Sequence, residues 1–267
     1  MMKIRAIALN TFNGLLRNKI IILFCAGMVC IMLLALTPLM LAKNNRGIPA
    51  DQMQTMVLAI IAGIMGMVSG FGSLLAAWSA ADAVASEMKS GTILAVMARP
   101  VRRWEFLLGK YLGVQMLTLL YVFAMLGLNY AMAAIGGIHI QTSVWPLIVY
   151  PFVRYAIFSA IAMLLVTVMH PIIAFGIVLV MSITAQIVAP SATPPQFMAP
   201  WVRQTLFDIL PSTSALSEIR FLTVTRATLR AAPWTDHVFT LAAGLDYALV
   251  CFLLAAWLFR NRTLSRD

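Results

Sequence analysis

The residues of this sequence that could do chemistry are gathered in one charged segment, residues 87–110, between two long apolar runs. The segment combines carboxylate, guanidinium and ammonium groups with two helix-breaking residues, Gly91 and Pro100. Such groups form ion pairs and charge-assisted hydrogen bonds most readily outside hydrocarbon. The apolar residues Ile93 and Leu94 would be exposed on a plain loop, which favours docking on lipid or in a groove of another protein. An ordinary charged loop is the alternative interpretation.

Residue patterns for catalysis and metal binding are missing from the sequence. Gly109 and Lys110 are followed by Tyr111 within a helical pattern, so they do not complete a phosphate-binding loop. The sequence has no nucleophile elbow, no His-Glu-x-x-His and no intramembrane pair of Asp residues. Its three His and three Cys residues lack ligand spacing and indicate neither a metal site nor a disulfide framework. We therefore expect a protein that is not an enzyme and holds no metal or cofactor of its own.

The composition is typical of a membrane protein. Of the 267 residues, 62% are hydrophobic and 10% are charged, whereas soluble chains carry about 25% charged residues. An apolar run of about 18 residues or more can cross a bilayer as a helix, which satisfies its own backbone hydrogen bonds. Six spans are predicted, over residues 20–42, 56–81, 106–135, 144–169, 172–189 and 238–259. The expected fold class is an all-α membrane protein with one transmembrane domain over residues 1–267.

Two segments outside the spans have amphipathic character. In residues 3–19 the apolar positions Ile4, Ala8 and Phe12 recur at helical spacing, which predicts a helix in the headgroup plane; a solvated helical leader is the alternative. This start does not show the pattern of a cleaved signal peptide. Residues 190–237 contain several prolines that exclude one long helix. We expect either short interfacial or re-entrant helices there or a flexible soluble loop.

The distribution of basic residues predicts the orientation in the membrane. If both termini are cytoplasmic, twelve Lys and Arg residues fall on that side and six on the other, with Arg154 inside a span. The net charge of +10 therefore reflects topology and attraction to anionic lipid headgroups rather than nucleic acid. We expect a multi-pass protein with both termini in the cytoplasm.

Two charged residues, Arg154 and Asp246, fall inside predicted spans at a similar depth, about 12 Å from the outer ends at a rise of 1.5 Å per residue. An unpaired charge there costs about 2.5–3.5 kcal/mol, and an arginine cannot lose its proton. They are therefore candidates for an intramembrane ion pair. Alternatively, Arg154 reaches the outer headgroups and Asp246 bonds to hydroxyl groups or water.

Small residues four positions apart indicate close contacts between helices. Gly66 with Gly70 and Gly109 with Gly113 form two such pairs. The pairs fit packing between subunits and packing within the chain equally well.

The charged segment resembles the one that follows the second span in the type-two export permeases of ABC transporters. In that family an acidic residue, a Gly-Thr-Leu-like turn, an Arg-Pro break and a Gly-Lys pair recur. The resemblance implies an elbow helix at residues 3–19, a cytoplasmic coupling segment at residues 82–103 and a coupling helix near residues 87–98. The implied contacts with a separate ATPase are Glu87, Gly91, Thr92, Arg99, Pro100, Arg103 and Lys110, with a second, smaller contact at His170 and Pro171.

This resemblance also implies a function. The chain would be the permease subunit that couples ATP hydrolysis by nucleotide-binding subunits to export of an amphiphilic or small substrate. It would work with a second permease copy, identical or not, in the bacterial inner membrane, while the partner ATPase binds ATP and Mg²⁺. A permease of the same fold that passes motion to an extracytoplasmic partner, as in metalloenzyme maturation, is an alternative. An ATP-independent channel or carrier is a further one, although no span shows the interrupted helix and dense polar lining of carriers.

Overall fold

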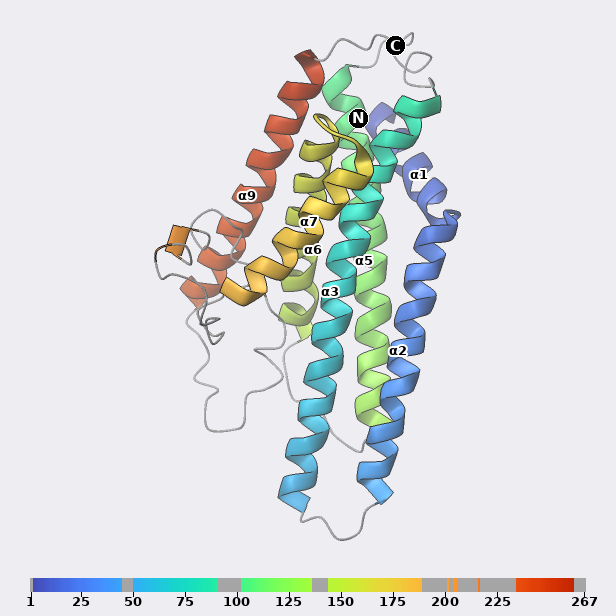
Figure 1. Cartoon of the computed structure of the whole chain (residues 1–267), viewed down its shortest axis with the longest axis vertical. Helices are drawn as coiled ribbons and strands as arrows, with labels where there is room; N and C mark the ends of the chain where they lie inside the picture. Colours follow the sequence, from blue (N-terminus) through green and yellow to red (C-terminus); the bar gives the residue numbers. More distant parts are fainter. Residues whose placement is uncertain are drawn as a thin grey trace.

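The computed structural model of the chain describes residues 2–44, 50–90, 102–135, 144–188 and 234–261, together with residues 201, 204, 205 and 216. Its long elements are all helices, as expected from the apolar runs (Figure 1). They are α1 (Met2–Leu16), α2 (Lys19–Asn44), α3 (Ala50–Ser90), α5 (Arg103–Ile135), α6 (Val144–Val166), α7 (Pro171–Val188) and α9 (Trp234–Asn261). The all-α fold class is therefore confirmed for this part of the chain.

The described helices are suited to a membrane. Four of them are long and apolar enough to cross a bilayer, and the number rises to five if the bent pair α1 and α2 forms one span. The apolar part of α7, Pro171–Ala185, is shorter, although the whole helix has 18 residues. At 1.5 Å per residue α7 is roughly 27 Å long, close to the thickness of the hydrocarbon core. The chain is a multi-pass membrane protein, and the number of six spans stays a prediction.

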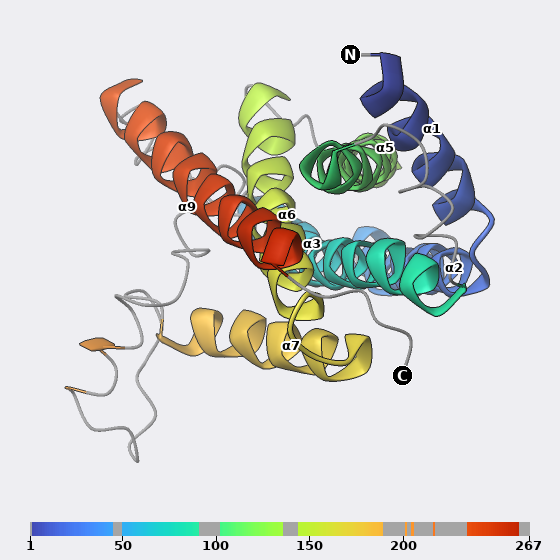
Figure 2. The ribbon, with the colours of Figure 1, turned by 90° about the horizontal axis from the view of Figure 1, so that it is seen from above.

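The helix α6 lies at the centre of the molecule, where it contacts α3, α5, α7 and α9. Figure 2 shows α9 and α1 on opposite sides of the group formed by α3, α5 and α6. The apolar window of α6 is 78% buried, whereas that of α9 is 22% buried. Most of the surface of α9 is therefore open to lipid or to another protein.

The first described residues and the end of α9 lie at the same end of the molecule. Arg103, at the start of α5, donates from Nη1 to the carbonyl of Arg260 at 3.0 Å. Ile7 of α1 lies against Gly109, two turns further along α5. We call this region, residues 3–19, 82–90, 102–110 and 260, the charged end. Its arrangement agrees with an even number of crossings, and its cytoplasmic orientation stays a prediction.

The helix α1 bends away from α2 by 61° and packs on α5. Glycines on α5 permit this contact, because a Cβ at Gly113 would lie 2.7 Å from the carbonyl oxygen of Ala8. A Cβ at Gly109 would lie 2.7 Å from Cγ2 of Ile7. The Gly109 and Gly113 pair thus serves packing within the chain, one of the two alternatives that the sequence left open.

Aromatic side chains join α6 to α9 at the opposite end of the molecule. The rings of Trp145 and Trp234 stack with their centres 5.4 Å apart. The hydroxyl of Tyr150 and Nδ1 of His237 are hydrogen-bonded at 2.6 Å. Aromatic side chains with one polar atom suit the boundary between hydrocarbon and water, so this cluster holds the two helices together where they leave the membrane.

Buried hydrogen bonds link α5 to α6 inside the membrane, and one of them gives a testable prediction. Nε2 of Gln115 donates to Oγ of Ser159 at 2.7 Å, with both side chains buried. We expect Ser159→Ala to lower the free energy of unfolding by about 1 kcal/mol, because the amide then lacks its acceptor. Thermal unfolding in a neutral detergent measures this change. The control is Thr184→Ala, whose hydroxyl bonds to Val180 of its own helix; equal losses in both variants would contradict the prediction.

Candidate functional site

The second span and the start of the charged segment form one continuous helix. The predicted cytoplasmic coupling segment, residues 82–103, begins within α3, which runs without interruption from Ala50 to Ser90. This continuity has a local cause, because residues 82–90 contain neither Gly nor Pro and are rich in helix-forming Ala, Glu, Met and Lys. The first helix breaker after the span is Gly91. Glu87 therefore lies on the rigid end of a long helix.

Four of the predicted contact residues, Gly91, Thr92, Arg99 and Pro100, lie outside the described residues. The same holds for nearly all of the predicted extracytoplasmic segment 190–237. The structure describes the two flanks of residues 91–101, and these flanks carry Glu87, Arg103 and Lys110.

The two flanks are joined by an ion pair between Glu87 of α3 and Lys110 of α5. The Nζ atom of Lys110 donates to Oε1 of Glu87. The side chain of Lys110 is 6% exposed and that of Glu87 is 20% exposed, and Nζ lies 5.5 Å from the centre of the Phe106 ring. The resemblance assigned both residues to the contact with an ATPase, and in the structure they pair with each other. An ammonium group buried beside an aromatic ring needs a counter-charge, and Glu87 supplies it.

The start of α5 is in turn fixed to the end of α9. Nη1 of Arg103 donates to the carbonyl oxygens of Phe259 at 3.2 Å and Arg260 at 3.0 Å. The last carbonyl groups of a helix lack partners within the helix and carry partial negative charge, so a guanidinium group stabilises them. The rings of Phe106 and Phe259 stack beside this contact, with centres 6.2 Å apart.

The junction between α1 and α2 is bound to α3 by residues whose contact the sequence did not predict. Nδ2 of Asn18 donates to Oδ2 of Asp82 at 2.7 Å, and Oδ1 of Asn18 accepts from the backbone of Ile20 at 3.0 Å. Asn18 is thus the N-cap of α2. An asparagine just before a predicted helix was the signal in the sequence that could have identified this residue. We call the contacts Asn18–Asp82, Glu87–Lys110 and Arg103–α9 the flank network.

The predicted second contact, His170 and Pro171, forms the turn between α6 and α7. Figure 1 shows this turn at the same end of the molecule as α1. Nδ1 of His170 accepts from the backbone of Ile172 at 3.4 Å, and Pro171 is the first residue of α7, a position that tolerates the missing N–H of proline. The side chain of His170 is exposed. The turn is therefore short and accessible.

The structure does not bring Arg154 and Asp246 together as an ion pair. Nε of Arg154 donates to Oγ of Ser73 on α3 at 3.2 Å. Asp246 is exposed on α9, which packs on the molecule through buried residues such as Ala248. Two positions along a helix correspond to a rotation of about 200°, so the carboxylate points away from the packed side. Lys110 and Glu87 are joined in an ion pair, but Arg154 and Asp246 are not.

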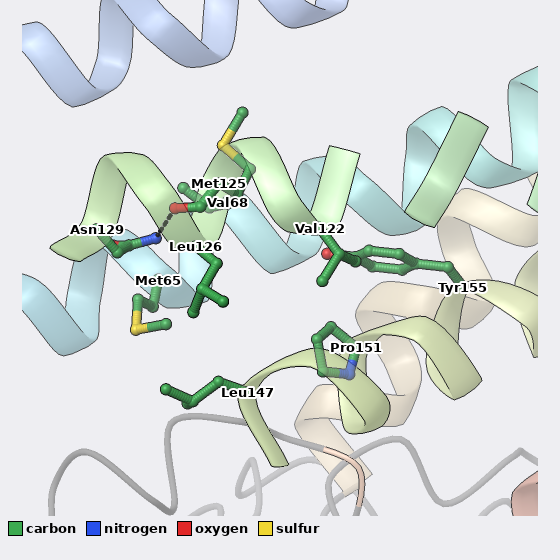
Figure 3. A pocket seen from close by; sticks show the side chains of 9 residues that line it. All are labelled: Met65, Val68, Val122, Met125, Leu126, Asn129, Leu147, Pro151 and Tyr155. Carbon is green, nitrogen blue, oxygen red and sulfur yellow. Dashed lines mark hydrogen bonds between the residues drawn. The ribbon is translucent and has the colours of Figure 1, made fainter. Parts of the chain in front are cut away.

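A small pocket lies between α3, α5 and α6. Figure 3 shows Asn129 at one end of it, Tyr155 at the other and Pro151 between them. Nδ2 of Asn129 bonds to the carbonyl of Met125 at 2.8 Å, while its buried Oδ1 has no partner among the described residues. The cavity volume is about 20 Å³, which is enough for one water molecule. This pocket is too small to hold a transported molecule.

The apolar helices define a multi-pass membrane protein, and the flank network lies at its charged end. The sequence model of the ABC-2 family transporter proteins matches residues 5–264, nearly the whole chain, and the protein belongs to this family. No curated protein matches the sequence. The resemblance carried by residues 87–110 is therefore confirmed. Proteins of this family are permease subunits of ABC transporters, which normally work with an ABC ATPase subunit.

Proposed function

We propose that the chain couples ATP hydrolysis by a separate nucleotide-binding subunit to the export of a substrate. The flank network is the observation that carries this proposal. The ion pair between Glu87 and Lys110 joins α3 to α5, and Arg103 joins α5 to the end of α9. A displacement of residues 91–101 by a partner would therefore move these three helices together instead of bending a loop.

The packing around the flank network supports transmission of such a movement. Tightly packed interiors move as units and switch between discrete arrangements rather than deforming continuously. The central helix α6 contacts α3, α5 and α9. A shift of these three helices would therefore displace α6 as well. In this proposal the ATPase binds ATP and Mg²⁺, residues 91–101 and the turn at His170 and Pro171 receive its motion, and a second permease copy completes the substrate path.

Copurification tests the proposed function directly. A tagged chain extracted in mild detergent is expected to bring down an ABC ATPase, and the assembled complex should hydrolyse ATP. A stoichiometric extracytoplasmic protein in the same complex would favour transmission of motion to that partner over export. Transport by the purified chain without any ATPase would reject the proposal.

The proposed orientation predicts which residues can be labelled from outside the cell. In a background without the three native cysteines, single cysteines at Ser191 and Thr228 should react with a membrane-impermeant maleimide in intact cells. A cysteine at position 89 should react only after the membrane is opened, because this position belongs to the charged end, which is predicted to be cytoplasmic. Labelling at position 89 in intact cells would overturn the proposed topology.

A further inference from the structure

Arg154 lies near the middle of α6, the most buried span among the described helices. It is ten residues from Val144, or roughly 15 Å along the axis at 1.5 Å per residue. Its side chain is part of the buried set, with 7% exposure. A guanidinium group keeps its charge in proteins, so this is a permanent positive charge at the depth of the hydrocarbon core.

The bonds of Arg154 orient it but do not balance its charge. Nε donates to Oγ of Ser73 at 3.2 Å, and the hydroxyl of Ser73 donates to the carbonyl of Ser69 at 3.1 Å. Both partners are neutral, and the described residues include no carboxylate within ion-pair distance of Arg154. The bond to Ser73 therefore orients the guanidinium group of Arg154, while no described carboxylate balances its positive charge.

The Nη atoms of Arg154 have donors that no described residue uses. The described side-chain atoms that are both fully enclosed and without a partner include Oγ of Ser69 but neither Nη atom of Arg154. No described residue bonds to these Nη atoms, so their donors are left for an acceptor outside the described contacts. They present the planar pair of donors that matches a carboxylate or phosphate.

A second donor lies close to this position. Ser69 is 1% exposed, and its hydroxyl has no partner among the described residues. Ser69 and Ser73 are four residues apart on α3 and so share one face of that helix. Buried hydroxyl groups are normally hydrogen-bonded, so the unpartnered hydroxyl of Ser69 is a second, independent sign of a missing acceptor.

The surroundings of this donor pair are apolar. The neighbours of Arg154 along α6 include the buried residues Val153, Ile157 and Phe158. A charged group embedded in a span is typical of substrate paths. One fixed cation and an enclosed, unpartnered hydroxyl therefore lie among apolar side chains.

We propose that Arg154, oriented by Ser73 and assisted by Ser69, binds the anionic group of an amphiphilic molecule inside the membrane. The chemical class is a carboxylate or phosphate attached to an apolar body. That this molecule is the exported substrate rests on the proposed function; that Arg154 binds an anion does not.

Binding to the purified permease in a neutral detergent tests the site without any ATPase. The probe is a fluorescent polyene fatty acid, cis-parinaric acid, at mildly alkaline pH, compared with its uncharged methyl ester. We expect the wild-type chain to bind the carboxylate at least tenfold more tightly than the ester. Arg154→Met should remove this preference, Arg154→Lys should keep part of it, and Ser73→Ala should weaken it. The matched control is Asp246→Asn, an exposed charge on α9, which should leave the preference unchanged.

The melting temperature of the unliganded variants separates binding from a structural role. Removing an uncompensated buried charge relieves its desolvation, so Arg154→Met should melt at the same temperature as the wild type or higher. If Arg154→Met melted at a lower temperature and still bound the carboxylate more tightly than the ester, the role of Arg154 would be purely structural. That result would overturn the proposal. Equal binding of acid and ester by the wild type would overturn it as well.

Vesicles then identify the source of the anion. If the ligand is a membrane lipid, phosphatidylglycerol added to phosphatidylcholine vesicles should displace the fatty acid. If it is the transported molecule, the complex with the ATPase should move the fatty acid on addition of ATP, and phosphatidylglycerol should compete weakly. Arg154-dependent binding without ATP-driven movement would show that this anion is not the exported substrate, while supporting the anion site.

Discussion

Lys110→Met is expected to lower the free energy of unfolding by about 3 kcal/mol and to uncouple ATP hydrolysis from transport. It leaves the carboxylate of Glu87 facing an apolar side chain, and loss of one partner from a buried ion pair typically costs 3–5 kcal/mol. The lower end of this range applies, because Glu87 is 20% exposed and water screens part of its charge. Uncoupling follows because α3 and α5 then lose the link that makes them move together.

The double variant Glu87→Leu with Lys110→Met distinguishes the effect of an unpaired charge from the effect of a lost contact between α3 and α5. An apolar pair of similar volume often replaces a buried ion pair with little loss of stability, so the double variant should unfold within about 1 kcal/mol of the wild type and recover coupling. Asp236→Asn, at an exposed carboxylate in the first turn of α9, is the control and should change stability by less than about 0.5 kcal/mol. Chemical unfolding and ATP-driven transport in proteoliposomes measure both effects. If Lys110→Met were as stable as the wild type, the ion pair would not be buried within the protein when the protein is in a membrane.

The helices could be predicted because their signal is local. The run at residues 144–169 became α6 (Val144–Val166), and the run at residues 238–259 became most of α9 (Trp234–Asn261). Apolar length decides whether a helix is stable in hydrocarbon, and no knowledge of neighbours is needed. The helix predicted to start near Asp82 is continuous with the second span, because helix propensity continues to Ser90; the cytoplasmic location of residues 82–103 stays a prediction.

The partners of charged residues could not be predicted in the same way. Glu87 and Lys110 are 23 residues apart, and whether they meet depends on the direction of the chain between α3 and α5. Lys110 did carry a usable signal, because it lies among apolar residues of α5 and therefore needed a counter-charge. The proposed partner for Arg154 was wrong for another reason: equal depth does not fix rotation about the helix axis. Arg154 bonds to α3, while Asp246 lies on the exposed side of α9.

The contact between α1 and α5 should be sensitive to a single methyl group. A Cβ at Gly113 would lie 2.7 Å from the backbone oxygen of Ala8 and 2.7 Å from Cβ of Thr11. A backbone carbonyl within a helix cannot rotate aside, so Gly113→Ala has to push α1 away from α5. Overpacking of this kind typically costs 1–3 kcal/mol, and we expect a loss of about 2 kcal/mol in the free energy of unfolding.

Gly127→Ala provides the matched control for Gly113→Ala on the same helix. A Cβ at Gly127 meets nothing within 4 Å, so the substitution should be neutral or stabilise α5 by about 0.5–1 kcal/mol through helix propensity. The difference between the two variants isolates the contact with α1 from the general effect of replacing glycine in α5. Because Asn18 joins α1 and α2 to Asp82 of α3, Gly113→Ala should also loosen the flank network and reduce ATP-driven transport. Chemical unfolding and a transport assay in proteoliposomes test both consequences, and equal behaviour of the two variants would show that α1 does not pack on α5 in the membrane.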